Sequence, residues 1–171
     1  MKKYFVLGVM LLLALSASSA LAVSYSEFVS GYNAAAAQAK DKSPTAAWIK
    51  AREYRNGSSR SYEVKFSSVY VTINANTENG VVSGVDLNGK TKNHAAFMRA
   101  FNHALAAFMP SFSAADRAAV VSRAKLNDKT FLKEARDGVN GFFNTAEYKG
   151  LEIMTAAGAE KGAFGVSFWL K

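Results

Sequence analysis

The two histidines are the residues of this sequence best suited to acid–base or metal chemistry. His94 and His103 lie nine positions apart, whereas two metal ligands on one helix need a spacing of three or four. At about 100° per residue, nine positions place the two side chains on nearly opposite sides of a helix. We therefore expect no joint metal site, and we expect His103, on the polar side of its helix, to be a solvated surface residue.

His94 is the stronger functional candidate, because it falls on the apolar side of the same predicted helix with Phe97, Met98 and Phe101. In a pocket beneath a sheet it would serve as a general base or a ligand contact, as in a hydrolase. The alternative is a residue at the helix boundary whose ring is satisfied by water or a carbonyl group. A cavity that brings an acid and a hydroxyl beside His94 would separate the two interpretations.

No other residues form a catalytic pattern. The chain has no cysteine, which excludes thiol catalysis and thiolate metal sites. Ser122 and Lys125 have the S-x-x-K spacing, but the companion motifs of that enzyme class are absent, so we interpret both as surface residues. The acids Asp86, Glu147 and Glu152 are scattered, and nothing selects a pair for glycoside cleavage. No catalytic residue, metal ligand or cofactor is therefore predicted, and no motif identifies a binding residue.

Aromatic residues crowd the C-terminal region and provide the best candidate for an interaction surface. If Phe164, Val166 and Phe168 face the core, the alternation of a strand turns Trp169 outward. An exposed Trp169 beside Tyr148 would suit a partner or a ligand, unless a second layer of helices covers it. The aromatic residues of this region are Phe142, Phe143, Tyr148, Phe164, Phe168 and Trp169.

The N-terminus predicts export. Lys2 and Lys3 precede an uncharged apolar run, residues 4–15, and Ala20-Leu21-Ala22 has the A-x-A form of a signal-peptidase site. The run is shorter than the roughly 20 residues that span a bilayer. We expect residues 1–22 to be a cleaved signal peptide and residues 23–171 to be one domain, periplasmic or extracellular, with no membrane span.

The charge of the chain is moderately basic, with 21 basic and 13 acidic residues. Removal of Lys2 and Lys3 leaves 19 against 13, a net charge of +6, which is ordinary for a soluble domain. The densest basic stretch, residues 50–65, contains Tyr54 and Tyr62 but matches no nucleic-acid motif. We expect no nucleic-acid partner, although acidic components of a cell envelope remain possible partners.

Periodicity predicts that helices and strands are segregated along the chain. Such an order is typical of an α+β fold, in which helices pack on an antiparallel sheet, here of about five to six strands. The predicted order is roughly ααβββααβββ. Ser24 with Glu27, and Ser113 with Asp116, have the spacing of a capping box at a helix start, and Asn79-Gly80 is a hairpin turn signal. Helices are expected over 24–40, 44–55, 93–109 and 113–124, and strands over 62–66, 69–73, 81–87, 139–143, 148–155 and 163–170, with 131–135 ambiguous.

These observations favour a non-enzymatic exported protein that binds a protein partner, an envelope component or an apolar small molecule. Two alternatives remain: a secreted hydrolase that uses His94, and a secreted effector or inhibitor that acts on another protein through a surface around Trp169. The sequence sets no oligomeric state and names no ligand.

Overall fold

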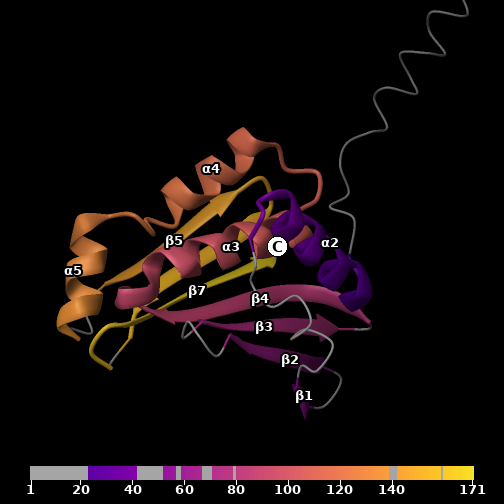
Figure 1. Ribbon diagram of the computed structural model, residues 1–171, viewed down its shortest axis with the longest axis horizontal. Helices are drawn as coiled ribbons and strands as arrows, with labels where there is room; N and C mark the ends of the chain where they lie inside the picture. Colours follow the sequence, from indigo (N-terminus) through magenta and orange to yellow (C-terminus); the bar gives the residue numbers. More distant parts are fainter. Residues whose placement is uncertain are drawn as a thin grey trace, which may run out of the picture.

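The protein is a two-layer α+β domain, in which helices cover one face of an antiparallel sheet (Figure 1). In the described part of the chain the sheet has seven strands in the order β1-β2-β3-β4-β7-β6-β5. The predicted fold class is confirmed. The predicted signal segment lies outside the described residues. The computed structural model describes residues 23–41, 52–56, 59–66, 71–78, 80–138, 142–158 and 160–171.

The described part of the N-terminal half supplies one helix and four strands of this architecture. Helix α2 begins after Ser24, whose side chain and that of Glu27 form the predicted capping box. The chain then forms an antiparallel meander, whose β3–β4 turn contains Gly80 at a φ of 81°, as the hairpin signal there predicted. The bounds are α2 Tyr25–Gln38, β1 Arg52–Asn56, β2 Ser59–Phe66, β3 Val71–Glu78 and β4 Val81–Lys90.

Strand β1 corrects the second predicted helix. We expected that helix to run as far as Arg55 and to be broken at Asn56, but Arg52–Asn56 pairs antiparallel with β2, with Arg52 opposite Glu63. Pairing with a neighbouring strand overrides the local preference, and the short segment by itself carries no sign of that partner. The rest of the predicted helix, residues 44–51, lies outside the described residues.

The C-terminal half supplies three longer helices and three strands. Asp128 caps the helix that contains the ambiguous stretch 131–135, and Ser113 with Asp116 forms the predicted capping box of α4. The bounds are η2 Thr91–Asn93, α3 His94–Phe108, α4 Ala114–Arg123, α5 Lys129–Asp137, β5 Phe143–Tyr148, β6 Leu151–Ala157 and β7 Ala163–Leu170.

A tight turn divides a segment that we predicted as one strand, residues 148–155. Lys149 and Gly150 have φ angles of 49° and 78°, which place both in the left-handed region. Two such residues make the turn that joins closely paired antiparallel strands. Strand β5 therefore ends at Tyr148 and β6 begins at Leu151, directly opposite. The predicted strand 139–143 is represented by its last residue, Phe143, because residues 139–141 lie outside the described part.

An aromatic layer joins α3 to the sheet. The ring centroids of Phe97 and Phe164 lie 4.4 Å apart, and those of Phe101 and Phe168 lie 5.7 Å apart, both in edge-to-face contact. All four side chains are buried. Helix α3 approaches the sheet at Gly89, where an added Cβ would lie 2.7 Å from Cδ2 of Phe97. The absence of a side chain at this position of β4 is therefore needed for the close packing of α3.

We predict that Gly89→Ala lowers the free energy of unfolding by about 1–3 kcal/mol, because the new methyl group displaces a buried ring. Urea unfolding of the variant and the parent protein measures the difference. Lys92→Ala, at an exposed site three residues away, should change stability by no more than about 0.5 kcal/mol. Equal stability of Gly89→Ala and the parent would contradict the close approach of α3.

Candidate binding surface

The face of the sheet opposite the helices is the candidate functional surface. Every described helix lies on the other face (Figure 1). In β7 the buried residues Phe164, Val166 and Phe168 alternate with half-buried ones, which point to the uncovered side. We call the outward side of β4, β7, β6 and β5 the open face.

Small side chains form a first hollow in the open face, a cavity of about 360 Å³ beside the β6–β7 turn. Ala156 and Gly165 are directly opposite each other on β6 and β7, and Ala163 lies next to them on β7. Met154 and Asn88 also line the cavity. Because the side chains of Ala156, Ala163 and Gly165 are only a methyl group or a hydrogen atom, the surface of the sheet is recessed at these positions.

Acids and an indole ring form a second hollow, of about 420 Å³, nearer the end of β7. The Trp169 Nε1–H donates a hydrogen bond of 2.6 Å to Oε2 of Glu152. Glu147 lies directly opposite Glu152 across β5 and β6. Like charges at opposite positions repel each other. The Lys171 ammonium group offsets this repulsion, because its Nζ lies 2.9 Å from Oε2 of Glu147 and 3.9 Å from Oε1 of Glu152. The hydrogen bond to Glu147 raises the pKa of Lys171, and the charges of both carboxylates contribute.

Two aromatic residues complete the open face. Phe143, at the start of β5, is 64% exposed and is the only exposed large hydrophobic residue among those the structure describes. Trp169 is half-buried and, as predicted, points away from the core. Tyr148 lies on the other face, because its hydroxyl donates a 2.7 Å hydrogen bond to Oδ1 of Asp116 on α4. The expected pairing of Trp169 with Tyr148 is therefore replaced by Trp169 with Glu152.

His94 makes the contacts of a residue at a helix boundary. It is the first residue of α3, and its Nε2 lies 2.8 Å from the carbonyl oxygen of Leu126. Its ring centroid lies 6.0 Å from that of Phe164. Neither cavity of the open face is lined by His94. The described geometry therefore gives the hydrolase interpretation no support.

His103 is buried, so its prediction as a solvated surface residue is wrong. Its Nε2 lies 3.0 Å from Oδ2 of Asp41, and its ring meets that of Tyr32 edge-on with centroids 5.5 Å apart. Burial raises the pKa of Tyr32, and the charge of Asp41 adds to this effect. Helix α2 covers this side of α3. The two helices lie so close together that a Cβ added to Gly31 of α2 would lie 3.2 Å from Cα of Ala107 on α3.

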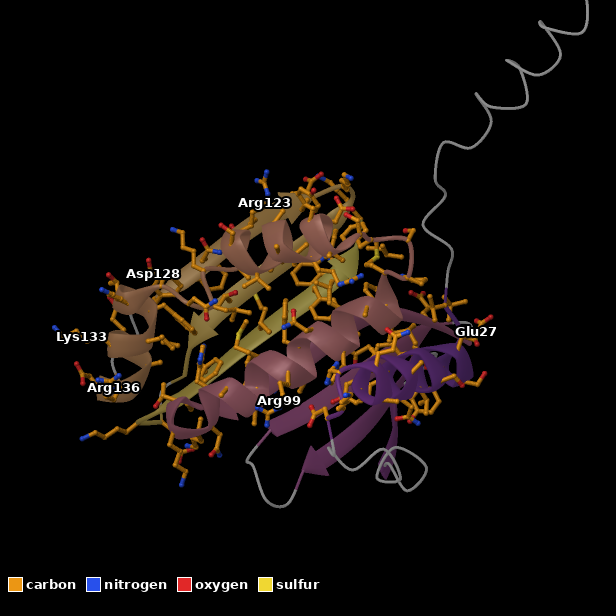
Figure 2. All side chains as sticks on the ribbon, turned by 45° about the horizontal axis from the view of Figure 1, so that its top comes forward. Glu27, Arg99, Arg123, Asp128, Lys133 and Arg136 are labelled. Carbon is orange, nitrogen blue, oxygen red and sulfur yellow. The ribbon has the colours of Figure 1, made fainter. Side chains whose placement is uncertain are left out.

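The His103–Asp41 pair joins the end of α2 to α3. Arg99 also reaches Asp41, with its Nε 3.3 Å from Oδ2, and its side chain lies beside α2 (Figure 2). Neither cavity of the open face includes these residues. The His103 and Asp41 side chains are buried, and their contact links the end of α2 to α3. A stripe of alanines on α3, at positions 100, 104 and 107, is the sequence signal for this second helix contact.

A polar cluster around Asp116 holds α4 over the edge of the sheet. Its Oδ1 accepts hydrogen bonds of 2.7 Å from the Tyr148 hydroxyl and 2.7 Å from Nζ of Lys149, while Oδ2 accepts from Ser113. The hydrogen bonds from Lys149, Ser113 and Tyr148, in that order, hold the pKa of Asp116 well below its usual range. This cluster fixes the β5–β6 turn and therefore the register that sets Glu147 opposite Glu152.

Among the residues that the structure describes, no three side chains of His, Cys, Asp or Glu come together as a metal site would require. None of the described helices combines the length and apolar character needed to cross a membrane. Ser122 and Lys125 are exposed and line a hollow between α4 and α5.

Known proteins add no further assignment. The chain matches no protein-family model, no curated protein and no solved structure. The function must therefore be argued from the open face itself. Sequence reasoning missed the Glu147–Glu152 pair, because the two acids become opposite only through the Lys149–Gly150 turn.

We predict that Asp116→Asn reduces stability in a pH-dependent way. The carboxylate stabilises the fold above its pKa in the unfolded chain, about 3.9. This contribution is lost as pH falls toward the lower pKa of the folded state. The stability deficit of Asp116→Asn should therefore be largest near neutral pH and shrink below about pH 5.

Urea unfolding of both proteins over this pH range measures the deficit. Tyr148→Phe, which removes one of the hydrogen bonds to Asp116, should show a smaller deficit with the same trend. A deficit that stays constant from neutral to acidic pH would contradict a stabilising role of the Asp116 charge.

Proposed function

We propose that this protein is an exported, non-enzymatic binding protein whose open face receives a protein partner or a component of the cell envelope. One observation carries this proposal: the open face has two neighbouring hollows and bears the exposed ring of Phe143. A single exposed ring would be ordinary, but Phe143 lies directly opposite Ala156, which lines the first hollow. The ring and the hollow therefore form one continuous apolar surface, and such surfaces mark interaction sites.

The physical character of the open face suits binding. Strands β4, β7 and β6 are fixed by their neighbours and by the core beneath them, so little conformational entropy is lost when a partner docks. The hollows combine small apolar residues with a few polar groups, such as Asn88 and Ser167, which matches the usual composition of ligand sites. The effector or inhibitor alternative would use the same surface, since Trp169 lies on it.

The start of the domain supports export with cleavage after Ala22. The Val23 carbonyl oxygen accepts a 2.7 Å hydrogen bond from the Val82 N–H, and the Val23 side chain is buried. Ser24 then caps α2. The first residue of the expected mature chain is thus also a residue of the folded domain.

We predict that the full chain, expressed in a secreting bacterium, is recovered outside the cytoplasm beginning at Val23. Intact mass and N-terminal sequencing of the purified protein measure this. Ala22→Leu should leave the precursor uncut, because signal peptidase requires a small residue at that position. Full-length protein in the cytoplasm would contradict the export proposal.

We predict that a photoreactive benzoylphenylalanine at position 145, on the open face, cross-links to a discrete partner in the envelope of producing cells. The matched control carries the same group at position 122 on α4, which is also exposed. The same adduct should disappear when Phe143→Ser removes the exposed ring from the position-145 protein. Adducts formed equally well from both positions, or from position 122 alone, would place binding elsewhere.

A further inference from the structure

We infer that the open face binds an extended, basic segment of another protein, with a lysine or arginine side chain held by Glu147 and Glu152 beside Trp169. An apolar side chain of the same segment enters the first hollow, which is lined by Ala156, Ala163 and Gly165. This inference rests on the proposed function and names the chemistry of the partner.

The charge of the open face is opposite to that of the chain. The whole sequence has 21 basic and 13 acidic residues. Strands β4, β5, β6 and β7 together carry three acids, Asp86, Glu147 and Glu152, and one base, Lys90. The residues that flank β7 at the two hollows add one acid, Glu160, and one base, Lys171, so acids still outnumber bases by four to two. Lys90 is itself ion-paired with Glu160. A basic partner is therefore attracted to a surface that repels anionic lipids and nucleic acids at short range.

Basic residues lie mainly outside the open face. The densest basic stretch, residues 50–65, contains β1 and nearly all of β2, at the other end of the strand order from β5. Arg123, Lys133 and Arg136 are exposed on α4 and α5, on the side of the molecule away from the sheet (Figure 2). The open face thus differs in charge from these regions, and a cationic partner is guided to the open face rather than to them.

The Lys171 ammonium group shows how the second hollow accommodates a cation. It contacts Glu147 and approaches Glu152. The Lys171 side chain is 60% exposed, so it leaves this position at little cost, since exposed ion pairs contribute little. A partner's ammonium or guanidinium group would replace it between the same carboxylates. Trp169, held by its hydrogen bond to Glu152, offers an indole ring beside this cation.

The spacing of the two hollows suits an extended chain. Gly165, in the first hollow, and Trp169, beside the second, are four residues apart on β7, or about 13 Å at 3.3 Å per residue. Residues i and i+4 of an extended peptide have the same separation and point to the same side. A basic residue followed or preceded by an apolar residue four positions away would therefore fill both hollows, whereas a small amine would fill one.

The test uses two synthetic peptides, acetyl-Lys-Ser-Thr-Ser-Leu-amide and its reversed sequence, titrated to about 5 mM into ¹⁵N-labelled residues 23–171. We expect amide shift changes on β5, β6 and β7 with at least one of the two. Norleucine in place of lysine keeps the aliphatic chain without the charge, and should weaken binding about tenfold, as loss of a charge-assisted contact does.

Two variants with opposite expected effects sharpen the test. Lys171→Ala removes the competing ammonium group and should strengthen peptide binding about two- to fivefold. Glu152→Gln removes one charge but keeps an oxygen that accepts the Trp169 hydrogen bond, and should weaken binding about tenfold. Asp137→Asn, at an exposed site on α5, loses the same charge away from the sheet and should leave binding unchanged.

Four outcomes would overturn the inference: no shift changes at 5 mM, equal binding of the norleucine peptide, shifts located on the helices, or self-association of the protein without peptide. Any of these, with position-145 cross-linking still intact, would leave the open face as a binding site for a partner of different chemistry. If neither peptide binding nor cross-linking from position 145 were observed, the proposed function would be contradicted as well.

Discussion

The aromatic contact between α3 and strand β7 is the interaction on which the rest of the structure depends. Phe97 and Phe101 pack edge-to-face on Phe164 and Phe168, and no disulfide assists them because the chain has no cysteine. Since Gly89 lets α3 lie so close to the sheet, one layer of helices suffices to bury the apolar side of the strands. The residues on the open face are then not required for this core, and their side chains can differ in type without disturbing it.

Much of the fold follows from local patterns. The capping boxes at Ser24 and Ser113, the turn at Gly80 and the alternation of β7 each predicted an element that the structure contains. The errors have different causes. Strand β1 forms a hairpin with β2, which begins only three residues after β1 ends, so the helix prediction overlooked a local strand pair. His103 is buried although it is polar, because its Nε2 meets Asp41 across a helix interface, and Asp41 lies far outside a helix-length window of the sequence.

The candidate surface was predictable only in part. The outward position of Trp169 follows from the two-residue period of its strand. The opposition of Glu147 and Glu152 does not, because it depends on the left-handed turn at Lys149 and Gly150. The hollow at Gly165 likewise requires small residues on two separate strands to become neighbours. Individual side-chain types can be recognised in a sequence, whereas cross-strand neighbours require the register.

The one-sided burial of the sheet has an evolutionary consequence. Along β7, inward positions such as Phe168 are constrained by the packing of α3, whereas outward positions such as Ser167 contribute nothing to that core. Substitutions on the outward side can therefore accumulate with little loss of stability. Related chains could diverge rapidly in what they bind while the helical side of the sheet stays nearly constant, and the two faces would then record selection of different kinds.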